Sequence, residues 1–354
     1  MLIYVIDGLN GVTDIVENYE SVIWNVQYFS KNDFQLVTVG SNENINKLAV
    51  GTLLCREEDI SNGVYQNVMM VESQKLDYDS DKGWILTVTG KGLKDILSRR
   101  IVWTQTTMTG SVEKAIRQII TENIISPENT DRQIPNFVLD AEQGFTDTAD
   151  IQLFGENIAE WLTTICQAYG YGWDVYISGG NYVFKLYKGT DRSYNQSEVA
   201  PVVFSPEYDN LLSSTYTYSL TDYKNAALIG GEGQGTSQRT ASVGTSTGLN
   251  RYEAYVDGSG VSSNGQIITA DQYTTMLEDF GQAQLSDTAY TEQFDGEIEA
   301  QGMYTINQDY FLGDIVQITN EKGITATPRI IEIIYAEDEN GTSVVPTFSE
   351  WEVK

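Results

Sequence analysis

The sequence predicts a mainly β protein with α/β insertions, and three observations support this fold class. Apolar and polar residues alternate with a period of two through the first hundred residues, which is typical of antiparallel strands. After Trp103 the apolar residues adopt helical spacing instead. Strand signals return at residue 201 and again from Phe294 onward. Two β-rich segments that flank an α/β segment therefore indicate two antiparallel β-barrel domains with two smaller insertions.

Residues 1–104 are predicted to form the first barrel domain. The apolar positions that share a strand face are Val22, Trp24, Val26 and Tyr28 on one strand, and Trp84, Leu86 and Val88 on another. Turn clusters separate the strands at Asp7-Gly8, Ser41-Asn42, Ser61-Asn62-Gly63 and from Asp77 to Gly83. A short helix from Leu93 to Leu97 closes this segment.

Residues 105–200 are predicted to form an α/β insertion domain. The first helix follows Ser111 and ends before Pro127, with its apolar face formed by Val112, Ala115, Ile116, Ile119 and Ile120. The second helix has a continuous apolar stripe of Ile158, Trp161, Leu162, Ile165, Cys166 and Tyr169, and Gly170 ends it. A hairpin that turns at Gly179-Gly180 pairs Trp173–Ile177 with Tyr182–Tyr187.

Residues 201–235 and 289–354 are predicted to form the second barrel domain, and 236–288 a loop and helix insertion. The stretch 230–248 is rich in Gly, Ser and Thr, which indicates a loop. A helix is expected from Thr269, because Gln272 completes a capping box with it. Its predicted buried stripe is Tyr273, Met276, Leu277 and Phe280. A final hairpin pairs Arg329–Ala336 with Ser343–Phe348 and turns at Asn340-Gly341.

The composition restricts the classes of function. The chain of 354 residues has 50 acidic and 21 basic residues, a net charge of −29, and no histidine. Such a charge repels phosphate backbones and excludes nucleic-acid binding through a basic groove. The lack of histidine excludes Ser–His and Cys–His nucleophile pairs and the commonest zinc ligand. Any catalysis would have to use carboxylates.

The remaining composition indicates a globular protein made in a cytoplasm. With 41% hydrophobic residues the chain can form ordinary cores, and no apolar run reaches the ~20 residues that span a bilayer. The first residues lack the basic segment of a signal peptide, so no membrane insertion is expected. Cys55 and Cys166 are predicted to be buried free thiols, since Cys166 falls on the apolar stripe of a helix.

An acidic segment and a glycine-rich segment each resemble a binding loop in part. Asp77, Asp79 and Asp81 alternate as in a calcium loop, but Lys82 and Val88 occupy the positions of its glycine and glutamate, which favours a solvated hairpin turn. The segment Gly230–Gly235 lacks the lysine and helix of a phosphate loop and is predicted to be a polar turn.

A second acidic row is the only candidate for hydrolase chemistry. Asp295, Glu297 and Glu299 alternate along one strand, as glycosidase carboxylates could, yet with 50 acidic residues in the chain a solvated or lumen-facing row is favoured. The segment from Asp309 to Asp314 is predicted to be a turn into a core strand. No catalytic, cofactor-binding or metal-binding residue is therefore assigned, and no cofactor is expected.

The aromatic residues, among them 22 tyrosines and 6 tryptophans, could stack on sugars or pack in cores and interfaces. Trp24, Trp84 and Trp161 fall on stripes predicted to face inward. Trp351, flanked by two glutamates, is the best candidate for a contact with a partner protein.

Several stretches together resemble the tail or baseplate hub proteins of siphophages and prophages, the siphovirus tail protein type that is related to the N-terminal hub module of tail-associated lysins. The stretches, in order along nearly the whole chain, are Asn18–Trp24, Gly90–Leu93 with Arg99–Trp103, Phe204–Leu211, Tyr223–Leu228, Asp309–Asp314 and Val345–Phe348.

The resemblance implies a non-enzymatic subunit of a homotrimeric ring at the distal end of the tail tube. Two tail-tube-like barrels per chain would give six similar barrels, which continue the tube and let DNA pass. The implied partners are the distal tail protein or tube ring, the tip or receptor-binding proteins and the tape-measure protein. The protein would be assembled in the host bacterial cytoplasm and reside in the virion, at the tail tip.

Two features refine this expectation. The chain stops at Lys354, shortly after the last matching stretch, so we expect no appended wall-degrading module. The acidic excess would suit a lumen that repels DNA phosphates. Two other functions remain open from the sequence: a carbohydrate- or receptor-binding tail-tip protein, and a carboxylate-based cell-wall hydrolase.

Overall fold

The computed structural model describes residues 1–7, 9, 11–261, 269–286, 288, 290–299 and 302–349, with only the backbone at 286 and 291–296. The chain divides into two compact units, one of Met1–Ser213 with Glu297–Ser349 and one that includes Ser214–Gly296. Each unit is described by itself. The four-part division expected from the sequence stays a prediction.

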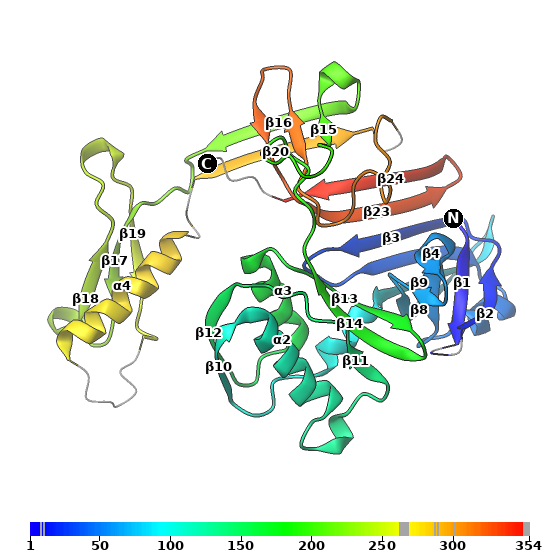
Figure 1. Cartoon of the computed structure of the whole chain (residues 1–354), viewed down its shortest axis with the longest axis horizontal. Coiled ribbons are helices and arrows are strands. Elements are labelled where there is room, and N and C mark those ends of the chain that lie inside the picture. Colours follow the sequence, from blue (N-terminus) through cyan, green and yellow to red (C-terminus); the bar gives the residue numbers. More distant parts are fainter. Residues whose placement is uncertain are drawn as a thin grey trace. The chain divides into compact units, whose positions relative to one another are not determined.

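The first unit is built on a curled nine-stranded sheet in which every neighbouring pair is antiparallel (Figure 1). Its strands, in spatial order, are β2 (Gly11–Val16), β1 (Ile3–Asp7), β5 (Leu53–Arg56), β8 (Met69–Asp79), β9 (Gly83–Gly92), β4 (Asp33–Val39), β3 (Ser21–Gln27), β23 (Ile330–Asp338) and β24 (Gly341–Phe348). The period-two alternation therefore correctly predicted antiparallel β-structure. Neither β2 nor β24 has a second partner among the described strands, so the sheet is an open half-barrel, and the two closed barrels stay a prediction.

The last two strands join the sheet formed by the first segment. β23 pairs with β3 in the register Tyr335↔Trp24, although about three hundred residues separate them. The final hairpin is confirmed, but its ladder closes at Asp338↔Gly341, so the turn lies one residue earlier than predicted. The Asn340 backbone N–H donates to Asp338 Oδ1 (2.7 Å), which stabilises this earlier turn.

The α/β part of the first unit contains both predicted helices. α2 (Val112–Ile120) begins at Ser111, whose hydroxyl accepts a hydrogen bond from the Lys114 N–H, and it continues as a π-helical turn, Thr121–Ile125. α3 (Ile158–Tyr169) ends at Gly170, which has φ +68° as a left-handed cap requires. The accompanying strands are β10 (Thr106–Ser111) with β12 (Thr148–Leu153), and a sheet of β11 (Phe137–Leu139), β14 (Asn181–Tyr187), β13 (Gly172–Ser178), β7 (Val64–Tyr65) and β6 (Ile60–Ser61).

Short elements complete the first unit. A small sheet contains β15 (Val203–Phe204), β21 (Gln317–Thr319) and β22 (Thr325–Ala326). The helical segments are α1 (Asn42–Lys47) and the 3₁₀ turns Glu57–Asp59, Leu93–Arg99, Thr130–Arg132 and Pro206–Tyr208. The predicted helix at Leu93 is therefore a 3₁₀ turn.

One continuous core joins the sheet to the α/β part. It includes Leu53 and Cys55 from the sheet, Ile116 and Leu162 from the helices, and Trp173 from β13. Cys55 and Cys166 are both buried and free, as predicted, and burial raises the pKa of both thiols.

The second unit is a three-stranded sheet with one helix. β17 (Ala226–Gly230) lies between β18 (Thr240–Val243), antiparallel to it, and β19 (Glu253–Asp257), parallel to it, and α4 (Ala270–Ser286) packs against β17 and β18. β16 (Leu211–Ser219) and β20 (Thr291–Ile298) pair with each other and carry the chain into and out of this unit. Two further 3₁₀ turns are Gly235–Ser237 and Gly248–Asn250.

Two details of the second unit correct the prediction. The stretch 230–248 is not all loop, because Thr240–Val243 forms β18, where Ala241 is buried against Ile229 and its neighbours. Tyr273 and Leu277 of α4 are buried as expected, but Met276 is 40% exposed, because the buried stripe repeats every four residues and leaves position 276 beside it.

The predicted capping box is confirmed by reciprocal hydrogen bonds between Thr269 and Gln272. In the described part of the chain, no helix has the length and apolar character required to span a membrane.

Candidate assembly surface

Tyr28 connects three distant segments of the first unit. It follows β3 and is fully buried, and its hydroxyl donates to the Gly170 carbonyl (3.1 Å) and accepts from the Gly189 N–H (3.1 Å). Gly172 and Gly313 pack so closely on its ring that a Cβ at either position would overlap the aromatic carbons. Burial raises the pKa of Tyr28, which keeps the phenol neutral.

A buried ion pair is formed by Asp314, the residue that follows Gly313. Asp314 is 2% exposed and pairs with Arg192 Nε (2.6 Å). Its other oxygen accepts from the Thr190 N–H (2.7 Å), and the Phe311 N–H (3.0 Å) donates to the oxygen shared with Arg192. The segment from Asp309 to Asp314 is thus a turn, as predicted. The Asp314 carboxylate binds Thr190 and Arg192, which follow β14 in the chain.

Lys94 is a buried cation that the sequence did not reveal. It is 1% exposed, and Nζ donates to the carbonyls of Gln27 (2.6 Å) and Ser30 (2.8 Å) and lies 5.1 Å from the Trp173 ring centroid. Burial lowers the pKa of Lys94 to about 8, although Asp174 acts in the opposite direction. A single lysine in a 3₁₀ turn gives no sequence signal of this environment.

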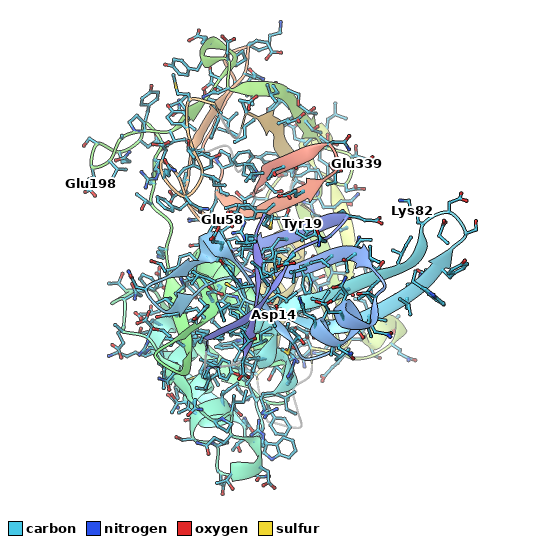
Figure 2. All side chains as sticks on the ribbon, turned by 90° about the vertical axis from the view of Figure 1, so that its right-hand side faces the viewer. Asp14, Tyr19, Glu58, Lys82, Glu198 and Glu339 are labelled. Atoms are coloured by element: carbon cyan, nitrogen blue, oxygen red, sulfur yellow. The ribbon has the colours of Figure 1, made fainter. Side chains whose placement is uncertain are left out.

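The β8–β9 hairpin extends beyond the rest of the sheet. β4 pairs with β9 only as far as Val39↔Ile85. The pairing of β8 with β9 continues past this point to Asp79↔Gly83. Figure 2 shows Lys82 at the tip of this projecting hairpin. The chain leaves β4 at Gly40, where a Cβ would lie 2.6 Å from Leu76 and 2.9 Å from Trp84, so only glycine fits.

The projecting hairpin presents an aromatic pair to solvent. Trp84 is 52% exposed and Tyr78 is 66% exposed, and their rings make an edge-to-face contact with centroids 5.1 Å apart. The prediction that Trp84 faces the core is wrong, because the hairpin has passed the edge of the core at this point, whereas Leu86 and Val88 further along β9 are buried. Trp24 is fully buried, as predicted, and Trp161 is half-buried against the core. Trp351 lies outside the described residues.

The acidic segment that partly resembles a calcium loop, Asp77 to Gly83, contains the turn of this hairpin. Asp79 Oδ1 accepts from the backbone N–H groups of Asp81 (2.8 Å) and Lys82 (2.9 Å), and these hydrogen bonds lower the pKa of Asp79. Asp77 pairs with Lys75 (2.8 Å). No cluster of three potential metal-binding side chains occurs among the residues that the structure describes.

The glycine segment lies in the second unit, and the acidic row runs from Asp295 of the second unit into Glu297 and Glu299 of the first. Gly230 ends β17, and Gly233 (φ +98°) and Gly235 (φ +59°) form the turn towards β18. Of the acidic row, Glu297 is exposed on β20, Glu299 is half-buried with its N–H bonded to the Asn210 carbonyl (3.1 Å), and the side chain of Asp295 lies outside the described residues.

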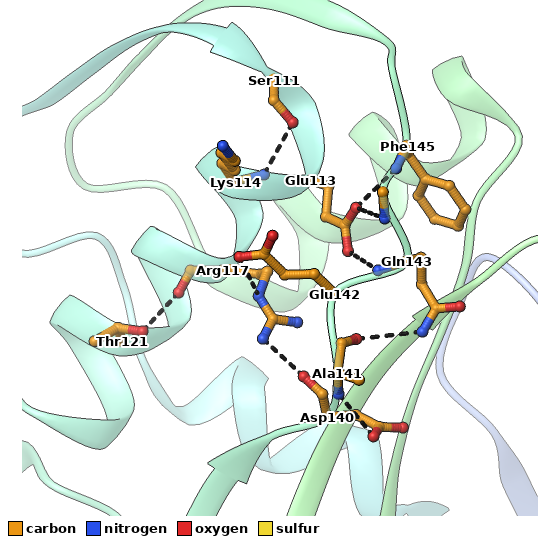
Figure 3. Close-up of polar contacts among 11 residues, drawn as sticks. Ser111, Glu113, Lys114, Arg117, Thr121, Asp140, Ala141, Glu142, Gln143 and Phe145 are labelled. Carbon is orange, nitrogen blue, oxygen red and sulfur yellow. Dashed lines mark hydrogen bonds and ion pairs between the residues drawn. The ribbon is translucent and has the colours of Figure 1, made fainter.

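Glu113 holds a surface loop of the α/β part. This carboxylate on α2 is buried and accepts three consecutive backbone N–H groups, from Gln143 (2.6 Å), Gly144 (2.9 Å) and Phe145 (2.9 Å). Figure 3 shows this contact beside Arg117, which donates to the Asp140 carbonyl (2.7 Å). Glu113 was not predicted from the sequence, although a glutamate beside the apolar positions of a helix is a signal that could have identified it.

The acidic excess lies at the surface. Among the described side chains, the buried acidic residues are Asp95, Glu113, Asp174 and Asp314. The other described acidic residues are at least partly exposed, although the Asp59 carboxylate pairs with the buried Arg56, so most of the acidic charge in the described part of the chain lies at the surface.

A family model and solved structures match nearly the whole chain. The model of the family described as Siphovirus ReqiPepy6 Gp37-like protein matches residues 2–348. No curated protein sequence matches the chain. One similar solved structure is a tail protein from Neisseria meningitidis, with 17% identity and a TM-score of 0.57 over 99% of this chain and 96% of that one. Another is the 43 kDa tail protein of prophage MuSo2 from Shewanella oneidensis, with 14% identity and a TM-score of 0.56 over 99% and 98%. At these identities the two structures establish a common fold alone.

Proposed function

The chain belongs to the family of Siphovirus ReqiPepy6 Gp37-like proteins, and we propose that it is a structural hub of the tail, a homotrimeric ring that continues the tail tube and lets DNA pass. The observation that carries this proposal is the family match over 2–348 together with a tail-protein fold that covers both chains almost completely. The protein is a phage tail component, and the role we assign to it is structural rather than enzymatic.

The projecting hairpin supports a role in assembly. A strand pair that extends beyond its sheet costs conformational entropy and buries little area in the isolated chain. Tyr78 and Trp84 supply the type of exposed aromatic surface that is enriched at protein interfaces. We infer that this tip contacts a neighbouring subunit, either a second copy or the adjoining distal tail protein or tube ring.

The surface charge supports passage of DNA without adhesion. Carboxylates around a channel repel phosphates, whereas lysine and arginine would bind them by releasing counterions. Most of the described acidic residues are at least partly exposed, and acidic residues outnumber basic ones in the chain, which suits a channel wall. We propose that part of this excess faces the lumen of the ring.

The remaining partners follow from this position. A hub contacts the tip or receptor-binding proteins on its distal side and the tape-measure protein within the channel, and we propose both as partners. The location is then the tail tip of the virion, after assembly in the host cytoplasm.

Cryo-electron microscopy of the assembled tail tests the hub proposal. We expect a single ring with threefold symmetry at the distal end of the tube, into which the curled nine-stranded sheet fits. A chain found in many copies along the tube, or attached singly to the outside of the tail, would contradict the proposal. Light scattering of the purified protein gives a second measure, with a trimer as the expected species.

A further inference from the structure

A polar groove opens beside Trp103 in the first unit. It has a volume of about 840 Å³ and lies between the segment that enters β10 and the end of α2. Its lining includes Trp103, Gln105, Glu122, Glu128, Asn129 and Arg132, together with threonine and serine hydroxyls. Neither the tail-hub proposal nor the projecting hairpin uses this groove.

Trp103 is exposed but held in place. Its side chain is 60% exposed, whereas the preceding residue, Val102, is fully buried. The Val102 N–H donates to the Glu156 carbonyl (2.9 Å), and its carbonyl accepts from the Gly155 N–H (2.8 Å). The Trp103 N–H donates to Asn123 Oδ1 (3.1 Å). The backbone at Val102 and at the Trp103 N–H is therefore held by three hydrogen bonds.

Arg132 braces the indole ring. Its guanidinium carbon lies 4.9 Å from the Trp103 ring centroid, in a cation–π contact. The guanidinium in turn donates to the Ile101 carbonyl (2.7 Å) and to Asn123 Oδ1 (3.3 Å). A tryptophan braced in this way presents a rigid, flat apolar surface to the groove with little further loss of rotamer entropy on binding.

The π-helical turn at the end of α2 also lines the groove. Thr121–Ile125 is the segment that carries both Glu122 and Asn123, and Asn123 is 3% exposed with its amide nitrogen bonded to the Ile119 carbonyl (3.0 Å). A π-turn is energetically unfavourable in a helix and occurs frequently at functional sites. Here the turn positions Asn123 to accept the Trp103 N–H and places Glu122 in the lining of the groove.

We propose that this groove binds a neutral oligosaccharide. The apolar faces of pyranose rings pack on a flat indole, and the planar amide, carboxylate and guanidinium groups beside it can each bond adjacent sugar hydroxyls in pairs. Two carboxylates and one guanidinium give the rim an excess of negative charge, which disfavours anionic glycans. Apart from Trp103, all the lining residues have polar side chains, which does not suit a lipid or an apolar peptide.

Titration calorimetry and saturation-transfer NMR of the full chain test this proposal. The probes are three neutral tetrasaccharides: N-acetylchitotetraose, maltotetraose and cellotetraose. We expect at least one to bind, and Trp103→Ala to weaken that binding about tenfold or more, because the truncated residue is the main contact surface. Arg132→Lys keeps the charge but loses the planar brace, so we expect an intermediate loss.

Trp84→Ala is the matched control, since it removes a tryptophan of similar exposure from the projecting hairpin. It is expected to leave saccharide binding unchanged. Because Trp103 is exposed, its replacement should keep the melting temperature, which verifies that the variant is folded. Failure of all three probes to bind at millimolar concentration overturns the proposal. So does binding that both tryptophan variants weaken equally, or that folded Trp103→Ala retains.

Discussion

At the scale of single residues, the buried charges determine how the distant segments of the first unit are held. Asp314 and Lys94 are each almost fully buried, and each is satisfied by a different set of partners. Asp314 has a guanidinium and two backbone N–H groups as partners, whereas Lys94 donates to two backbone carbonyls and forms no ion pair within the described part of the chain, although Asp174 acts on its pKa. Their removal therefore has different consequences.

Asp314→Asn is expected to lower the free energy of unfolding by about 3 kcal/mol, since it leaves Arg192 without its counter-charge in a site that is mostly buried. Urea unfolding measures the change. The control is Asp77→Asn, which breaks an ion pair of similar length at the exposed hairpin and should cost less than about 0.5 kcal/mol. Equal effects of the two substitutions would show that the ion pair of Asp314 contributes little.

Lys94 is expected to make stability rise with pH. Its folded pKa of about 8 lies below the ordinary value of 10.5, so between these values the unfolded chain binds the proton that the folded chain has released. The contribution of Lys94 therefore increases from about pH 8 to about pH 10.5, by up to ~3 kcal/mol at ~1.4 kcal/mol per pH unit.

Unfolding of wild type and Lys94→Met at about pH 7.5 and about pH 10 measures this contribution. We expect the stability of wild type relative to the variant to be greater at the higher pH. A difference that does not change with pH would mean that Lys94 stays charged in the folded protein.

At the scale of elements, α2 is both a core helix and the anchor of a loop. Its apolar face is buried as the spacing predicted, and within that face Glu113 accepts the N–H groups of residues 143–145. A carboxylate offers acceptors only, which matches three donors that all point at it.

Glu113→Gln is expected to loosen this loop, because the amide replaces one acceptor oxygen by a donor that opposes the loop N–H groups. The expected loss is about 2 kcal/mol, as for hydrogen bonds to a charged group. Hydrogen exchange of the amides of 143–145 should accelerate, while exchange in β13 and β14 changes less. Glu160→Gln, at an exposed position of α3, is the control. Unchanged protection of the loop amides would contradict the role assigned to Glu113.

At the scale of the whole molecule, Trp84 and Trp103, the exposed tryptophans among the described residues, are expected to have separate roles. Trp84 lies on the projecting hairpin and Trp103 beside the polar groove, and neither side chain contributes to the core. Substitution of either is therefore expected to affect binding rather than folding.

Trp84→Ala is expected to weaken assembly while the melting temperature stays within a few degrees of wild type. An interface residue of this type contributes about 2 kcal/mol or more, which corresponds to a dissociation constant some thirtyfold higher. Mass photometry across a dilution series measures the trimer fraction, with Trp103→Ala as the control. If Trp84→Ala assembles as wild type does, the hairpin tip is not part of the trimer interface, and its contact would have to be with the adjoining ring.

The sequence by itself determined the local elements. The helices of 112–120 and 158–169, the hairpin at 179–180 and the capping box at Thr269 follow from spacing and capping chemistry, which act over a few residues. The free buried thiols and the exposed acidic surface followed from composition. The resemblance to siphovirus tail proteins, carried by stretches along nearly the whole chain, is confirmed by the family match.

Only the tertiary structure decided which segments meet. Period-two alternation does not show that β23 pairs with β3. It also does not distinguish Trp84 from Leu86, which fall on the same face of β9. The two differ in burial because the pairing of the neighbouring strand β4 stops at Val39↔Ile85. Short strands such as β18, the environment of Lys94 and the groove at Trp103 depend in the same way on residues far apart in sequence. Burial is a property of the packed molecule, and the sequence specifies it only through contacts that local rules do not describe.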